Sequence, residues 1–77
     1  MNKERRKSVL GALSLIAQAK EVLETARDEE QEYLENMPEG LQGGDKGSAA
    51  EEALTALEEA IDSLDEIDSN VTAGIGA

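Results

Sequence analysis

The sequence predicts an all-α protein, built as an antiparallel two-helix hairpin that self-associates into a helical bundle. Two long segments, 3–36 and 49–70, carry apolar residues at helical spacing and contain no proline. The segment between them, 37–47, holds the single proline and most of the seven glycines, which is typical of a loop. A chain of 77 residues makes at most one domain, and its end, 71–77, is expected to form a flexible tail.

The first helix is predicted over 3–36, where Gly11 is the only glycine. Its apolar residues recur every seven positions along two parallel lines, which are Val9, Ile16 and Leu23 and then Ala12, Ala19 and Ala26. Pro38 disfavours helical backbone at Met37, so this helix is expected to end just before it.

The second helix, 49–70, repeats almost literally in sevens, as "AEEALTA", "LEEAIDS" and "LDEIDSN". The repeat gives two apolar lines, one of Ala50, Leu57, Leu64 and Val71 and one of Ala53, Ala60 and Ile67, with Leu54 and Ile61 widening the stripe. Ser48 followed by Glu51 is a capping-box pattern, which predicts that the helix starts directly after Ser48. Asn70 and the glycines after it mark the end.

Alanine at every seventh position of both helices favours a close approach of the two axes, because small side chains let the backbones come near each other. Helix propensity alone is the alternative explanation for these alanines. The same spacing in both segments favours the packing role.

The unequal lengths of the helices predict a homo-oligomer, either a dimer or a tetramer. Folding back from the loop, the second helix covers the first only to about residue 14. The segment 9–17 is apolar nearly all the way round, which is more than one partner helix can bury. The residues expected to contact a second copy are Val9, Leu10, Leu13, Ile16, Ala19 and Val22.

The charge distribution predicts how two copies meet. The net charge is −11, yet 3–7 ("KERRK") is basic while 28–32 ("DEEQE") is acidic. If two first helices cross antiparallel near 17–18, the basic segment of one meets the acidic segment of the other. The facing pairs would then be Leu13 with Val22 and Ile16 with Ala19. Exposed ion pairs contribute only about 0–1 kcal/mol each, so apolar burial supplies most of the free energy of association. The alternative interpretation of the basic segment is a solvated, frayed helix terminus.

The composition predicts that the protein is not an enzyme. The chain has no cysteine and no histidine, which excludes disulfides, thiol nucleophiles, imidazole bases and the usual zinc sites. A core of Ala, Leu, Ile and Val offers little from which to build the sheltered pocket that paired catalytic carboxylates need. No catalytic residue, metal site or cofactor is expected, because the carboxylates also lack the spacing of an EF-hand loop.

Charge and hydropathy also limit the partners and the location. Direct binding to duplex nucleic acid is disfavoured, because affinity there comes from Lys and Arg. The acidic surface either imitates a nucleic-acid backbone toward a basic protein or only keeps the protein soluble. No stretch approaches the roughly 18 apolar residues of a membrane span, so a cytoplasmic location without membrane contact is expected. The alternative, a secretory signal in 3–19, conflicts with the helical register of the same residues.

The loop combines two kinds of sequence. "GLQGGDKGS" (40–48) has glycines before a lysine, as in a phosphate-binding loop, but it lacks the Gly-Lys-Ser/Thr ending and a preceding strand. A flexible connection is therefore the prediction for this half. In the other half, Met37 and Leu41 are expected to fold back on Tyr33 and Leu34 as an ordered plug.

"DEEQEYLENMPEGLQGGDKG" (28–47), followed by "LEEAIDSLDEI", resembles short acidic proteins carried by phages and mobile elements of Gram-positive bacteria. The resemblance covers about half of the chain, and "MPEGLQ" is its distinctive core. It implies a location in the host cytoplasm. Small helical, oligomeric phage proteins of this kind include antagonists of host defence; some sequester cyclic nucleotide signals between subunits, and others block a defence protein directly.

Two functions follow from this resemblance. The first is a sponge that binds a small cyclic nucleotide at subunit interfaces, with four candidate ligand residues: Lys20, Arg27, Tyr33 and Lys46. The tyrosine would stack on a base, and the cations would bind phosphate. Ordinary pairing of Lys20 and Arg27 with Glu24, and packing of Tyr33 at the helix end, are the alternative explanations. The second function is an acidic protein-binding module, or nucleic-acid mimic, that blocks a basic host defence protein.

Overall fold

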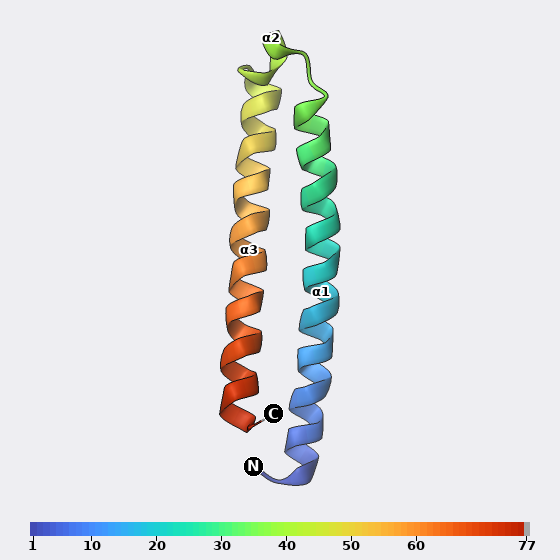
Figure 1. Ribbon diagram of the computed structural model, residues 1–77, viewed down its shortest axis with the longest axis vertical. Helices are drawn as coiled ribbons and strands as arrows, with labels where there is room; N and C mark the ends of the chain where they lie inside the picture. The colour runs from blue at the N-terminus through green and yellow to red at the C-terminus, as the bar shows by residue number, and fades with distance from the viewer. Residues whose placement is uncertain (77) are drawn as a thin grey trace.

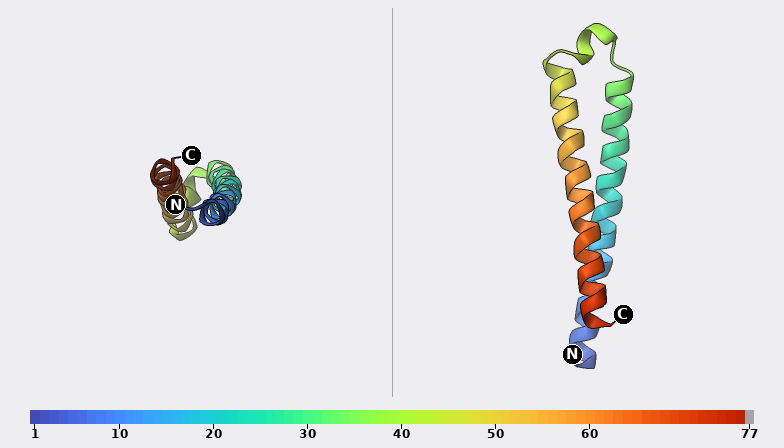
Figure 2. Two further views of the ribbon diagram at one scale, coloured as in Figure 1. Left: turned by 90° about the horizontal axis from the view of Figure 1, so that it is seen from below. Right: turned by 60° about the vertical axis from the view of Figure 1, so that its left-hand side comes forward.

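The computed structural model describes residues 1–76 and is all-helical over that range. Three helices follow one another along the chain, α1 (Lys3–Glu35), α2 (Glu39–Gln42) and α3 (Asp45–Ile75), as Figure 1 shows. The two long helices run in opposite directions and pack against each other along their length (Figure 1), and the end-on view in Figure 2 shows them next to each other. The rod that results measures 58 × 15 × 14 Å. The predicted all-α class is confirmed, and no helix in residues 1–76 has the length and apolarity to span a membrane.

α1 begins and ends within one residue of its predicted bounds. Asn2 caps its start, because the Asn2 side chain accepts a hydrogen bond from the Arg5 backbone N–H at 2.8 Å. At the other end, the Asn36 N–H donates to the carbonyls of Glu32 and Leu34 before the chain turns at Pro38. The proline therefore ends the helix as expected.

α3 is longer at both ends than the predicted helix 49–70. It starts after Gly44, and Ser48 lies inside its first turn, with its N–H donating to the Gly44 carbonyl at 2.9 Å. The capping-box prediction is therefore wrong, and the predicted loop 37–47 contains all of α2 and the first residues of α3. The reason is Gly47, which has no side chain and therefore lets the first turn of α3 approach the backbone of Gln42, where a Cβ would overlap the Gln42 carbonyl oxygen.

The C-terminal end of α3 also differs from the prediction of a flexible tail over 71–77. The helix continues to Ile75, whose side chain is buried, and Gly76 ends it in the left-handed conformation, at φ 72°. Burial of Ile75 supplies a physical reason for order in this last turn. The remaining residue of the predicted tail, Ala77, lies outside the described residues.

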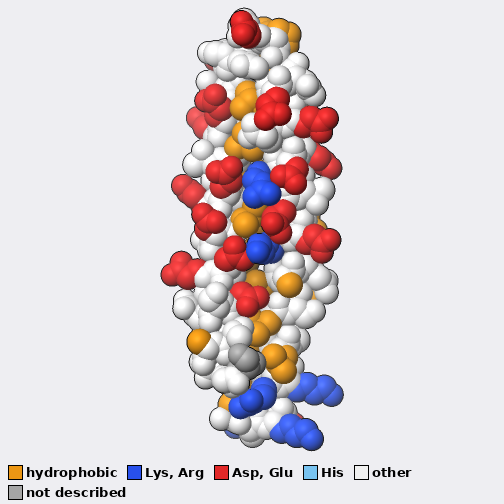
Figure 3. All heavy atoms as spheres, in the orientation of Figure 1, with side chains coloured by type: hydrophobic (Ala, Val, Ile, Leu, Met, Phe, Trp, Pro, Cys, Tyr) orange, Lys and Arg blue, Asp and Glu red, His pale blue; other side chains and the backbone are white. Residues whose placement is uncertain are grey.

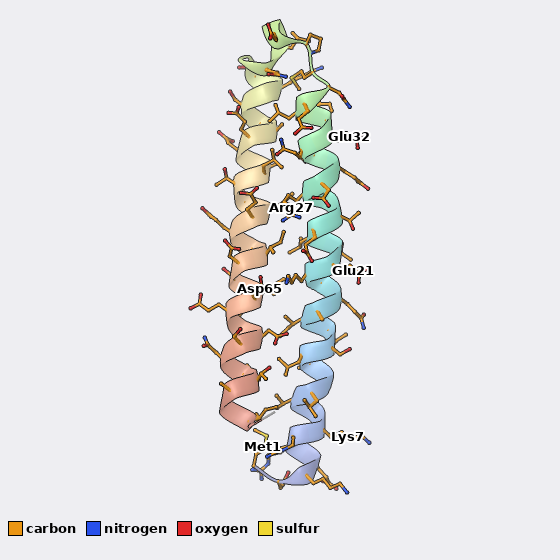
Figure 4. All side chains as sticks on the ribbon, viewed as in Figure 1. Met1, Lys7, Glu21, Arg27, Glu32 and Asp65 are labelled. Carbon is orange, nitrogen blue, oxygen red and sulfur yellow. The ribbon has the colours of Figure 1, made fainter. Side chains whose placement is uncertain are left out.

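The contact between α1 and α3 follows one line of residues on each helix, at alternating spacings of three and four. On α1 the half-buried line is Val9, Leu13, Ile16, Lys20, Leu23, Arg27, Glu30 and Leu34. On α3 the buried and half-buried line is Gly47, Ala50, Leu54, Leu57, Ile61, Leu64, Asp68, Val71 and Ile75. Side chains of both lines fill the space between the helices (Figure 4).

The predicted alanine lines do not form this contact. Ala12 and Ala19 are exposed, Ala26, Ala53 and Ala60 are only half-buried at its margins, and Ile67 is 45% exposed. The other predicted line of each helix does lie on the contact, and so do Leu54 and Ile61, as predicted. On α1, Leu13 and Leu34 take the place of the predicted alanines. These larger side chains remove more apolar area from water than alanines do. This explains why each helix is rotated about its axis so that they, and not the alanines, face the other helix.

The loop end is held by Gln42. Its Nε2 donates to the Leu34 carbonyl at 3.1 Å and to the Met37 carbonyl at 2.9 Å, which satisfies backbone groups that the end of α1 leaves open. Met37 is buried, as the predicted plug requires, but Leu41 is 55% exposed and takes no part in such a plug. The first half of the loop is therefore ordered structure built on one glutamine and one methionine.

Candidate functional site

One side of the two-helix layer carries no charge over most of its length. On α1, a second line with spacings of three and four lies about a quarter turn from the contact with α3, and it consists of Ala12, Leu15, Ala19, Val22 and Ala26. The matching line on α3 consists of Ala49, Ala53, Ala56, Ala60, Ser63 and Ile67. On each helix this line lies one residue before the line that contacts the other helix, so both lines are reached by the same rotation about the helix axis. Because the two helices are antiparallel, this rotation brings both lines to the same side of the layer. We call these residues the uncharged face.

The uncharged face exposes large aliphatic side chains. Leu15 is 66% exposed, Val22 is 67% exposed and Ile67 is 45% exposed. A shallow groove of about 540 Å³ beside Val22 and Ala26 is also lined by Gln18, Glu21, Thr25 and Glu29, so it marks the edge of the uncharged face on the outer side of α1. An apolar, uncharged strip that continues over several turns of two helices is typical of a surface that another helix covers.

The opposite side of the layer is acidic. Carboxylates from both helices line it, and they are Glu21, Glu24, Asp28, Glu51, Glu58, Asp62 and Asp65. We call this set the acidic face. Figure 3 shows a view in which red side chains of both helices flank the middle of the rod, with blue side chains between them. Within 8–28 of α1 and 51–65 of α3, the basic residues are Lys20 and Arg27.

Lys20 and Arg27 are both paired with carboxylates of their own chain. Lys20 Nζ lies 2.5 Å from Asp65 Oδ1 across the two helices. The hydrogen bond to Asp65 raises the pKa of Lys20 above its usual 10.5, burial opposes that rise, and the charges of Asp65, Glu24 and Asp68 add to it. Arg27 donates from Nε and from its terminal nitrogen to Asp28 Oδ1, at 3.2 and 3.1 Å. The expected partner Glu24 acts on Lys20 only through its charge.

We expect the Lys20–Asp65 pair to stabilise the fold below pH 10.5 and to lose that contribution as the pH rises above it. A lysine whose pKa is raised by folding binds its proton more tightly in the folded state, so deprotonation favours unfolding. The measurement is the free energy of unfolding of the wild type and of Asp65→Asn between pH 8 and pH 12. The difference between the two proteins should shrink above the Lys20 pKa; a constant difference would contradict the pairing.

The other two candidate ligand residues meet at the loop end of the rod. Tyr33 and Lys46 line an open hollow of about 360 Å³ together with Asn36, Met37, Pro38 and Leu41. Tyr33 is 50% exposed there. Lys20 and Arg27 are not among the residues that line this hollow, so the structure divides the four predicted ligand residues between two places.

The residues predicted to contact a second copy are also divided. Val9, Leu13 and Ile16 are half-buried on the line toward α3, whereas Leu10, Ala19 and Val22 are exposed. Ala19 and Val22 belong to the uncharged face. Leu15 and the α3 half of that face were not predicted as contacts to a second copy. The alternating spacing of three and four between Ala12, Leu15 and Ala19 is the sequence pattern that indicates this face.

Within residues 1–76 no group of three or more carboxylates is placed to hold a metal ion. Comparison with protein-family models, with curated proteins and with solved structures gives no significant match to this chain. The features of the described residues that bear on function are the two faces and the hollow at the loop end.

Proposed function

We propose that the protein is a non-enzymatic binding module: a helical hairpin that self-associates through its uncharged face and presents its acidic face to a basic surface of a partner protein. The single observation that carries this proposal is the separation of charge between the two sides of the layer. Opposite faces of this kind suit a four-helix bundle, in which apolar faces meet inside and polar faces remain outside.

The spacing of residues on α1 supports a two-fold arrangement of two copies. Leu15 and Ala19 have residue 17 as their midpoint, and so do Ala12 and Val22. An antiparallel crossing of two α1 helices at that level sets each large side chain opposite an alanine, which suits close packing. The crossing agrees with the level expected from charge, near 17–18, but Leu15 and Ala12 replace Leu13 and Ile16 as the contact residues, because those two face α3.

α3 adds to the same interface. Because Lys20 pairs with Asp65, residue 17 of α1 lies close to the level of Ile67 on α3. Ile67 is exposed on the uncharged face and would meet its own counterpart near the two-fold axis. The layer measures 58 by 15 Å in outline, which is enough for the about 800 Å² per partner of a standard protein interface.

The acidic face is then directed outward, where it can bind a basic protein surface or occupy a groove made for nucleic acid. Charge complementarity of this type guides association and depends on salt. A role in host–phage conflict, as the resemblance implies, belongs to this proposal: the protein would block a basic defence protein in the host cytoplasm.

The test compares two variants with the same change of charge. Glu58→Lys with Asp62→Lys alters the acidic face, whereas Glu52→Lys with Glu59→Lys alters the outer edge of α3. In pull-downs from host lysate at low and at high salt, we expect a salt-sensitive partner that only the acidic-face variant fails to capture. Equal loss by both variants, or capture that salt does not affect, would contradict a specific role for the acidic face.

A nucleotide sponge is the second candidate function, because Tyr33 and Lys46 line the same hollow. A ring for stacking beside a cation for phosphate is a suitable pair for a small nucleotide. The pairing of Lys20 and Arg27 with carboxylates removes the other two candidate ligand residues from this role. Calorimetry with a panel of cyclic dinucleotides tests it: heat that Lys46→Glu abolishes supports the sponge, and absence of heat excludes these ligands.

A further inference from the structure

From the structure we infer that the hollow at the loop end is completed by a second copy of the chain, whose Arg5 lies between Glu29 and Tyr33 at the edge of the hollow. This inference rests on the self-association proposed above and specifies how the ends of the two α1 helices meet. The first turn of the partner's α1 faces residues 28–31 and ends beside the hollow, so the partner's Arg5 side chain covers the edge of the hollow at Tyr33.

The first observation is the course of the uncharged face beyond its apolar part. Continued at the same spacing, the α1 line reaches Ser8 and Arg5 in one direction and Glu29 and Tyr33 in the other. The face therefore begins with a cation, ends with a carboxylate and an aromatic ring, and is uncharged between them. Tyr33 belongs both to this line and to the lining of the hollow.

The second observation is which charged residues fall on the line. In the basic segment 3–7, only Arg5 does so, and Lys7 points away from α3 in Figure 4. In the acidic segment 28–32, only Glu29 does so. Glu30 lies on the contact with α3, and Glu32 also points away from α3 in Figure 4. The spacing thus selects one residue from each segment.

The third observation is that these two residues obey the same symmetry as the apolar ones. Arg5 and Glu29 share residue 17 as their midpoint, the level at which Leu15 and Ala19 are also centred. A two-fold axis at this level places Arg5 of each copy opposite Glu29 of the other, about 18 Å from the axis at about 1.5 Å per residue. Tyr33 is one turn beyond Glu29, within reach of the long arginine side chain.

The chemistry of the three groups fits this contact. A guanidinium binds a carboxylate through two parallel hydrogen bonds and stacks on an aromatic face, whereas a lysine ammonium does neither as well. Tyr33 is half exposed in the single chain, so its ring is open to such stacking. Arg5 would cover the ring and the mouth of the hollow, and the two ends of the dimer would be closed in the same way.

Charge exchange tests this inference. Arg5→Glu alone and Glu29→Arg alone should each raise the dimer Kd about tenfold, because each turns two exposed ion pairs of the dimer into repulsions. The double exchange, Arg5→Glu with Glu29→Arg, should restore most of the affinity. Arg6→Glu and Glu24→Arg are matched controls off the line and should leave the Kd within about twofold. The Kd is measured by sedimentation.

A second measurement locates the contact. Tyr33 is the only aromatic residue of the chain, so its fluorescence reports on the loop end alone. Acrylamide, an uncharged quencher, should quench the wild-type dimer less than the Arg5→Glu variant at equal dimer occupancy. A dimer whose Kd and Tyr33 quenching are both unchanged by Arg5→Glu would overturn the inference and leave the proposed self-association standing. A wild type that stays monomeric at micromolar concentration in low salt would overturn both.

Discussion

Replacing Gly47 with alanine is expected to destabilise the fold by about 2–3 kcal/mol, because the new Cβ would overlap the backbone of Gln42 at its carbonyl. Gly47 is buried on the contact line of α3, directly beneath the α2 turn. The overlap involves backbone atoms, which cannot move aside without breaking the two hydrogen bonds that Gln42 makes at the end of α1. The measurement is chemical unfolding followed by far-ultraviolet circular dichroism at one protein concentration.

Gly11→Ala is the matched control. Gly11 lies inside α1, is exposed, and has no other atom within 4 Å of the position of an added Cβ. This substitution should stabilise the protein by about 0.5–1 kcal/mol, since alanine loses less backbone entropy than glycine when a helix forms. Opposite signs at the two glycines are the expected result. A Gly47→Ala protein as stable as the wild type would show that α3 and α2 do not approach each other as described.

Leu15→Glu is expected to make the protein monomeric at micromolar concentration, with a Kd for the proposed dimer at least about 100-fold higher than that of the wild type. Two buried leucines would be lost from each dimer, and two carboxylates would be enclosed without partners. Leu10→Glu provides the control, because Leu10 is also an exposed leucine of α1 but lies on the acidic side. Sedimentation velocity of the two variants at the same concentration makes the comparison.

Equal behaviour of the two leucine variants would contradict the assignment of faces. If both remain dimeric, the uncharged face is not the interface. If both become monomeric, the loss reflects added negative charge on a chain that already carries −11, and the face cannot be the cause.

The sequence was sufficient to predict the helical class and the end of α1, because Pro38 acts on the backbone beside it. The Asn2 cap at the start of α1 was not predicted. The local sequence did not predict the start of α3 correctly. The pattern of Ser48 and Glu51 is a genuine capping sequence, yet the helix starts one turn earlier, because Gly47 has no side chain and its turn can pack against the backbone of Gln42. Which of two possible starts is used depends on packing against α1, which the local sequence does not contain.

Half of the contact between the helices was predicted correctly: the predicted lines with Val9 on α1 and with Leu57 on α3 lie on it, but the alanine line beside each of them does not. Ala12 and Leu13 are neighbours in sequence, and each begins a heptad line, so periodicity alone supports both. Which of the two lines contacts α3 depends on the total apolar area that both helices bury. The line with Leu13 and Leu34 forms the contact, although it also brings Lys20 and Arg27 there. The alanine line is left outside, which is why the candidate interface contains residues that the sequence analysis had assigned to the core.

The candidate ligand residues illustrate a similar limit. Tyr33 and Lys46 could not be placed together from the sequence, because the distance between them depends on where the chain turns and where α3 starts. Lys20 was expected to pair along its own helix with Glu24, but its partner is Asp65, on the other helix. Contacts between distant parts of the chain follow from the register of the two helices, and a single residue of slip changes every one of them.

The position of Tyr33 makes the protein its own optical probe. As the sole aromatic residue, it is the only side chain that absorbs appreciably near 275 nm, and it sits where α1 gives way to the turn. Far-ultraviolet ellipticity, by contrast, is an average over both long helices. Heating the unlabelled protein while recording the two signals would therefore distinguish opening of the turn from melting of the rod, because the two melting curves separate only if the turn opens first.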